Sequence, residues 1–222
     1  MNNEMNIVQK NAEAKSHQAR SFGWYQNIYG RLDPREIAAR CGLPYDGHSF
    51  SLRIMNRKYL AAFPEFSLEP ADTGTAGAAK GYEKILFIRF LCEGKYAESS
   101  GKQLSYREIP WGDLYYPNFE GRCIKRLARK FGGSIETFRK TAEENLSAEK
   151  LEQSDAGYRF EFCSGFYMSF LLWKADEEFP ASAQILFDDN FPHGFTAEDC
   201  AVAGEVAMNH MLSAIENNKQ SV

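Results

Sequence analysis

The segment YRFEFCSGFYMSFLLWKADEEFPASAQILF, residues 158–187, carries the strongest strand signal in the chain. Apolar and polar residues alternate over residues 158–163, and Ser164-Gly165 separates this run from a second apolar run at 166–173. A third alternating run follows at 181–187. A period of two indicates strands, and a glycine-containing two-residue connection indicates a hairpin. The segment therefore predicts three consecutive antiparallel strands.

The same alternation occurs earlier, at residues 48–68, where a break at Asn56-Arg57 predicts a second hairpin. Residues 94–106 indicate a polar loop. Helical patterns, with apolar residues three and four apart, occupy the ranges 8–28, 34–40, 82–91, 119–131, 134–145 and 196–215. A buried strand is the weaker alternative for 82–91, because the flanking residues 76–84 favour helix. We therefore expect an α+β fold with a mostly antiparallel sheet of about five or six strands and helices packed against it.

Several predicted helix ends carry capping residues. Asp33 before Pro34 is a favourable start, with Glu36 placed to complete a capping box, and Gly42 is suited to a left-handed stop. Asn118 is the expected cap of the helix that runs to the glycine pair at 132–133. Thr196 and Asp199 form a capping-box pattern with the shorter acid.

Composition describes an ordinary globular chain. The 222 residues are 44% hydrophobic and 25% charged, with a formal net charge of −4, which argues against disorder and against bulk nucleic-acid binding. We expect a single domain over residues 1–222, with a poorly packed segment at about 1–8 and a frayed tail at about 217–222. The oligomeric state is not determined by the sequence.

The compartment follows from what the sequence lacks. The N-terminal residues have no apolar core of a secretory signal, and the densest apolar run, residues 166–173, is too short to span a membrane. The five cysteines are widely spaced with no C-x-x-C pair, so neither a disulfide framework nor a zinc ribbon is expected. These features predict a soluble cytoplasmic protein without membrane association.

The first candidate site is an aromatic and polar stretch at residues 111–122. Aromatic rings beside an acid, an amide and a guanidinium are typical of a ligand pocket, and a helix start offers N–H groups to an anion. The alternative is that the aromatic residues only anchor a long loop. The ligand-binding candidates are Trp111, Asp113, Tyr115, Tyr116, Asn118 and Arg122.

The second candidate is a set of carboxylates with one histidine in the C-terminal third. Such oxygens could hold a hard cation, although a regular hairpin places the acidic triplet at 176–178 about 20 Å from Asp188. The alternative is a solvated turn followed by an acidic helix start. The metal candidates are Asp176, Glu177, Glu178, Asp188, His193 and Glu198.

Two further patterns give weaker indications of phosphate binding. A basic helix face could track phosphates, or could simply be solvated; it comprises Arg122, Lys125, Arg126, Arg129 and Lys130. The glycine-rich stretch at 74–81 lacks the spacing of a phosphate-binding P-loop.

Three stretches resemble a known family: WGDLYYPNFEGRCIKRLARKFG at 111–132, LLWKADEEFPASAQILFD at 171–188, and TAEDCAVAGE at 196–205. They are similar to domain of unknown function family 3786, which occurs in anaerobic bacteria and archaea. The resemblance runs from about residue 20 to 210. It implies a source in anaerobes and a neighbourhood in one-carbon or corrinoid metabolism. Some relatives are joined to an iron–sulfur module, whose cysteines this chain lacks. The family supplies no catalytic residues.

Nucleophile motifs are absent, and the sequence identifies no cofactor. We therefore expect a non-enzymatic accessory module that binds a small molecule or a protein partner. The alternative is a metal-assisted hydrolase that uses carboxylates of the C-terminal third, which requires these groups and His193 to converge within about 5 Å.

Overall fold

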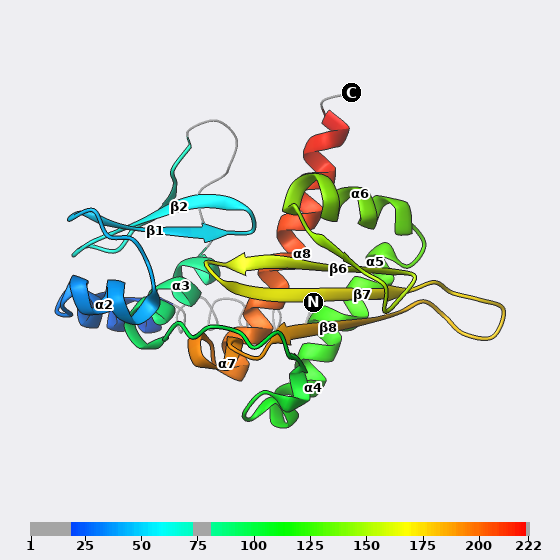
Figure 1. Cartoon of the computed structure of the whole chain (residues 1–222), viewed down its shortest axis with the longest axis horizontal. Coiled ribbons are helices and arrows are strands. Elements are labelled where there is room, and N and C mark those ends of the chain that lie inside the picture. Colours follow the sequence, from blue (N-terminus) through cyan, green and yellow to red (C-terminus); the bar gives the residue numbers. More distant parts are fainter. Residues whose placement is uncertain (1–18, 73–80, 221–222) are drawn as a thin grey trace, which may run out of the picture. The chain divides into compact units, whose positions relative to one another are not determined.

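In the computed structural model, the described residues are 19–72 and 81–220, with eight strands whose pairings are all antiparallel (Figure 1). The predicted α+β class is confirmed, with more strands than the expected five or six. The chain divides into two compact units, residues 1–51 with 59–95 and residues 52–58 with 96–222. The expectation of a single domain stays a prediction. In the described part of the chain, no helix is long and apolar enough to cross a membrane.

The first unit contains several helices and most of the residues of the antiparallel strands β1, β2 and β3, whose residues 52–58 belong to the second unit. Its helix α2 starts as predicted, because the Asp33 carboxylate accepts the Arg35 N–H at 2.8 Å and Pro34 is the first helical residue. Gly42 ends the helix in the left-handed conformation, as expected. The elements are the helix at 19–29, α2 (Pro34–Cys41), β1 (Ser49–Ile54), β2 (Arg57–Ala62), β3 (Leu68–Pro70) and α3 (Gly81–Glu93).

The second unit is built on the predicted three-stranded segment. The order β6-β7-β8-β4 is continuous, β5 pairs with β6, and Ile54, which belongs to this unit, pairs with Cys163. The strands are β4 (Gln103–Ser105), β5 (Glu149–Leu151), β6 (Ala156–Cys163), β7 (Phe166–Trp173) and β8 (Ser182–Asp188). The prediction of a loop over 94–106 is wrong at its end. Three residues are too few to show an alternating pattern, and β4 forms because β8 offers its edge to Gln103–Ser105.

One face of this sheet carries the apolar core. Phe160 and Phe170 meet edge to face at 5.0 Å between ring centroids, and both are buried. The helices of this unit pack against that face, with α5 and α8 behind the strands in Figure 1. They are α4 (Gly112–Phe119), the π-helical turn η2 (Glu120–Ile124), α5 (Lys125–Phe131), α6 (Ile135–Leu146), α7 (Phe191–Gly194) and α8 (Ala197–Gln220), with the 3-10 turn η1 (Tyr106–Glu108) before them.

The predicted start of the helix before Gly132 is wrong. The helix begins at Gly112, so Asn118 lies inside it and caps nothing. Proline usually ends a helix because it lacks an N–H and crowds the preceding turn, yet Pro117 is inside α4 and the chain continues through η2 into α5. The buried stripe that spans these elements stabilises the continuous helix, and it is the predicted one: Phe119, Cys123, Leu127 and Phe131.

Other predicted features stand. Thr196 and Asp199 cap α8 reciprocally, with Asp199 N–H to Thr196 Oγ1 at 3.3 Å and Thr196 N–H to Asp199 Oδ2 at 3.1 Å. The five cysteines are free thiols. The glycine-rich stretch at 74–81 lies almost entirely outside the described residues.

Buried thiols predict a stability that falls in alkali. Burial raises the pKa of Cys41 to about 11 and of Cys123 to about 12, whereas an ordinary thiol titrates near 9. Because the unfolded chain loses these protons first, the stabilisation is complete below pH 9 and declines as the pH rises toward the folded values. Urea midpoints should be constant below pH 9 and fall between pH 9 and 11, and Cys123→Ala should make the fall shallower. A flat profile would contradict the prediction.

Candidate functional site

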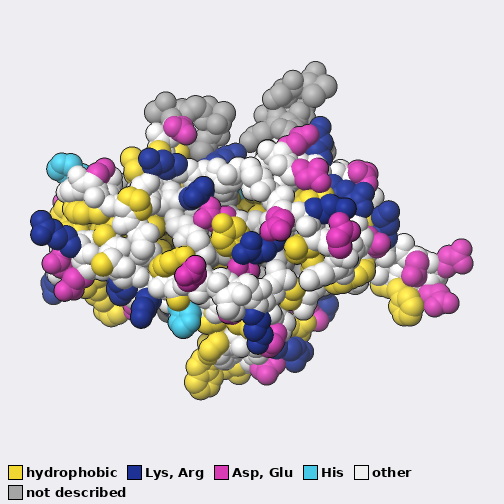
Figure 2. Space-filling view, viewed as in Figure 1, with side chains coloured by type: hydrophobic (Ala, Val, Ile, Leu, Met, Phe, Trp, Pro, Cys, Tyr) yellow, Lys and Arg dark blue, Asp and Glu magenta, His cyan; other side chains and the backbone are white. Residues whose placement is uncertain are grey.

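The start of α4 presents a group of large apolar side chains to solvent. Trp111 is 78% exposed, Leu114 is 71% exposed and Tyr115 is 41% exposed. Their spacing of three and four residues places them on one side of the first helical turn. Figure 2 shows hydrophobic side chains gathered at this end of the molecule, over the start of α4. We call Trp111, Leu114 and Tyr115 the α4 apolar cluster.

The backbone beneath this cluster is held in place from both sides. The buried Tyr106 ring stacks on Phe119 at 3.9 Å, and its hydroxyl donates to the Ala197 carbonyl at 2.7 Å. Ser105 and Glu108 form a capping box around η1, and the Gly112 N–H donates to the Ile109 carbonyl at 2.8 Å. The cluster therefore stands on a fixed support and not on a free loop.

Trp111 itself has an unfavourable backbone conformation. Its φ of 67° and ψ of 5° lie in the left-handed region. A bulky residue rarely adopts this region, which costs roughly 1–2 kcal/mol without glycine. The fold thus holds a strained tryptophan whose side chain stabilises little by burial.

Charged groups at the edge of the cluster interact with one another. The Arg107 guanidinium lies 3.8 Å from the centre of the Tyr116 ring and donates to the Asp113 carboxylate at 3.3 Å. Two of the predicted ligand-binding residues, Asp113 and Tyr116, are therefore used to orient Arg107. Both charges are well exposed, so their pair adds little to stability.

Arg122 does not join the aromatic residues. It lies about two helical turns beyond Tyr115 and forms a two-pronged ion pair with Glu205 of α8, with one N–O distance of 2.8 Å. The hydrogen bond to Glu205 raises the pKa of Arg122. Asn118 is exposed on α4. Trp111 and Tyr115 are thus exposed at the start of α4, whereas Arg122 is paired with Glu205 of α8. The small-ligand site made of these residues stays a prediction.

The acidic triplet forms the tip of the β7–β8 hairpin. The Asp176 carboxylate accepts the N–H groups of Glu178 at 2.8 Å and Phe179 at 2.7 Å, which lowers the pKa of Asp176. Glu177 and Glu178 are exposed. Figure 2 shows acidic side chains on this projecting tip. These contacts of Asp176 agree with the alternative interpretation, in which the acidic triplet belongs to a solvated turn.

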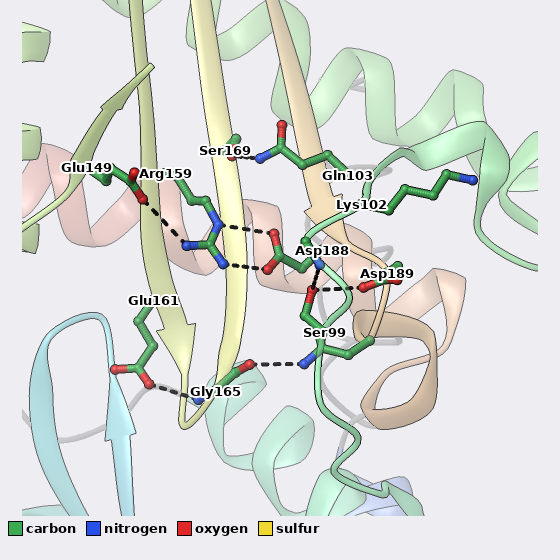
Figure 3. Close-up of polar contacts among 12 residues, drawn as sticks. Ser99, Lys102, Gln103, Glu149, Arg159, Glu161, Gly165, Ser169, Asp188 and Asp189 are labelled. Atoms are coloured by element: carbon green, nitrogen blue, oxygen red, sulfur yellow. Dashed lines mark hydrogen bonds and ion pairs between the residues drawn. The ribbon is translucent and has the colours of Figure 1, made fainter.

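Asp188 lies at the other end of β8, inside a polar cluster on the face of the sheet opposite the apolar core (Figure 3). It is 1% exposed, and the Arg159 guanidinium donates to its two carboxylate oxygens at 2.6 and 3.3 Å. Arg159 also lies over the Tyr167 ring at 4.0 Å, and Ser169 accepts a bond from Gln103 beside it. The Asp188 carboxylate is therefore neutralised by the Arg159 guanidinium, a cation of the protein itself.

The remaining metal candidates do not complete a site. His193 is exposed on α7, and Glu198 is exposed in the first turn of α8. Over residues 19–72 and 81–220, no three His, Cys, Asp or Glu side chains are placed to hold a metal ion. The convergence that a metal-assisted hydrolase would need is not present in these residues.

The sequence missed Leu114 and Arg159. Leu114 follows Trp111 by three residues, and this spacing becomes informative only if the helix is known to begin at Gly112. Arg159 alternates with apolar residues in a strand, and such a residue is normally solvated. A carboxylate at the end of a buried strand needs a cation beside it, so Asp188, which follows the apolar run of β8, is the signal that could have pointed to Arg159.

Most of the chain, residues 33–210, matches a family model described as a domain of unknown function, DUF3786. The chain belongs to this family. This agrees with the resemblance of the stretches at 111–132, 171–188 and 196–205. No curated protein and no solved structure matches the chain. Membership in the family assigns no activity, so the functional argument rests on the side chains themselves.

Proposed function

We propose that this protein is a binding module that docks a protein partner through the α4 apolar cluster. The observation that carries the proposal is the exposure of Trp111, Leu114 and Tyr115 together on a fixed support. Contiguous exposed apolar groups on a soluble chain mark interaction surfaces. Tryptophan and tyrosine are also the residues that most often contribute large binding energies at protein interfaces.

The spacing of the cluster suits a partner that offers an apolar groove. Side chains at positions i, i+3 and i+4 of one helix enter such a groove together, while the backbone of the helix keeps its own hydrogen bonds. The strain at Trp111 supports the same conclusion. A left-handed tryptophan that is mostly exposed costs stability in the free protein, and a bound partner would bury its ring.

The setting of the proposed function in anaerobic one-carbon or corrinoid metabolism rests on the family resemblance alone. It guides the choice of material: lysate from an anaerobe that encodes the protein is the source in which a partner is sought.

Trp111→Asn is expected to abolish partner binding while leaving the fold intact. Asparagine tolerates the left-handed region, so the change relieves strain and should leave the free energy of unfolding unchanged or raise it by up to about 1 kcal/mol. Loss of a central tryptophan at an interface costs at least about 2 kcal/mol, or roughly thirtyfold in affinity. Proteins captured from lysate by wild-type and variant baits are compared, and the affinity of each purified candidate is then measured for both.

Phe179→Asn is the matched control. Phe179 is also an exposed aromatic residue, but it lies on the β7–β8 hairpin tip and outside the α4 apolar cluster. Its replacement should leave capture unchanged. If no protein is captured more strongly by the wild type than by Trp111→Asn, the proposed function is wrong.

A further inference from the structure

We infer that the partner of the α4 apolar cluster is an acidic protein segment, in which apolar residues are followed by carboxylates. This inference rests on the proposed function and adds the charge of the partner. Its basis is the change in character along one continuous helix, from the apolar cluster at the start of α4 to a basic surface on α5.

The α4 apolar cluster and the basic surface of α5 lie on the exposed side of the same continuous helix. Phe119, Cys123, Leu127 and Phe131 form the buried stripe of this helix. The solvent side begins with Leu114 and ends with Arg129 and Lys130, all of which are exposed. At 1.5 Å per residue, Leu114 and Arg129 lie about 20 Å apart along the axis. A helical segment of about 16 residues, or a shorter extended one, reaches from one region to the other.

The basic end has cations available for a partner. Arg122 and Lys125 are already paired, with Glu205 and Glu120 respectively. Arg129 and Lys130, by contrast, make no ion pair within the described part of the chain. Charges that a monomer leaves unpaired beside an apolar contact surface favour a partner of opposite sign, mainly by raising its association rate.

The α4 apolar cluster beside the basic end favours an acidic protein partner over a nucleic acid. A surface that binds a nucleic-acid backbone needs several cations in a row. Of the other three cations of this helix face, Arg122 and Lys125 pair with carboxylates of the protein and Arg126 donates to the Asn209 side chain. The exposed Leu114 side chain can neither hydrogen-bond to a base nor form an ion pair with a phosphate, so a nucleic acid gains little from contact with it. The net charge of −4 also disfavours a polyanion of high charge density.

The test is selection from a display library of random 20-residue peptides on the wild-type protein. Enriched peptides are synthesised with a fluorophore, and their binding is measured by anisotropy at 50 and 200 mM NaCl. The variants are Trp111→Asn and the double charge reversal Arg129→Glu/Lys130→Glu. The double reversal Lys140→Glu/Lys150→Glu changes the net charge equally, at two exposed lysines of α6 and β5, and is the matched control.

We expect the enriched peptides to combine apolar residues with Asp and Glu. They should lose binding to Trp111→Asn, bind the Arg129→Glu/Lys130→Glu protein about tenfold more weakly at 50 mM NaCl, and bind the control normally. Peptides that need Trp111 but show neither acidic enrichment nor sensitivity to the reversal would overturn this inference and leave the proposed function standing. A selection in which no peptide depends on Trp111 would overturn both. Competition for the same peptides by a 20-base-pair DNA duplex at 150 mM NaCl would assign the basic end to nucleic acid and also overturn the inference.

Discussion

Gly112→Ala is expected to lower the free energy of unfolding by about 3 kcal/mol or more, because the added methyl group overlaps main-chain atoms. A Cβ at Gly112 would lie 1.8 Å from the Tyr106 carbonyl oxygen and 2.9 Å from the Tyr106 carbonyl carbon. These atoms cannot move aside, since the Tyr106 ring is buried and stacked on Phe119. Thermal unfolding should shift down by about 6–12 °C for a chain of this size.

Gly121→Ala is the control for this prediction. Gly121 lies in the same continuous helix, and a Cβ built there has nothing within 4 Å. Alanine should be neutral or stabilise the helix by up to about 1 kcal/mol, because it reduces the freedom of the unfolded chain. If the two variants melted together, the close approach of Gly112 to Tyr106 would not exist in solution.

Arg159→Met is expected to be the most destabilising change on the polar face of the sheet. It leaves the Asp188 carboxylate, 1% exposed, without the guanidinium that neutralises it. Breaking a buried pair by removing one partner typically costs about 3–5 kcal/mol. Urea denaturation of the purified variant measures this loss. The change in midpoint gives the change in the free energy of unfolding if the dependence of that free energy on urea concentration is the same as in the wild type.

A second substitution tests the cause of that loss. Arg159→Met/Asp188→Leu removes both charges and should recover most of the stability, since apolar residues replace a buried pair at little cost. Lys140→Met breaks the exposed pair with Glu144 on α6 and should change the free energy of unfolding by less than about 0.5 kcal/mol. A double variant no more stable than Arg159→Met would show that the loss does not come from an unpaired carboxylate.

Local signals in the sequence predicted many of the elements correctly. The alternation at 158–187 gave β6, β7 and β8 with the turn at Ser164-Gly165, because strand period and turn chemistry are properties of neighbouring residues. The cap at Asp33 and the reciprocal pair of Thr196 and Asp199 were correct for the same reason. Each involves residues at most three apart.

The errors occurred where distant residues override local preference. Pro117 favours a break in the chain, but the buried stripe of Phe119, Cys123, Leu127 and Phe131 packs against the sheet and keeps the helix continuous from Gly112. The aromatic residues at 111–116 stay a predicted site. Their division into exposed and supporting groups was not predictable, because it depends on Tyr106, Ala197 and Arg107.

The sequence by itself determined the α+β class, the strand segments, most helix ends and the family, since these depend on periodicity and on short motifs. Only the tertiary structure decided which side chains meet. It paired Asp188 with Arg159, 29 residues away, and so removed the carboxylate from the metal candidates. It also left Trp111 and Leu114 exposed, because burial depends on which elements pack over a residue, and a residue's neighbours in the sequence do not specify that.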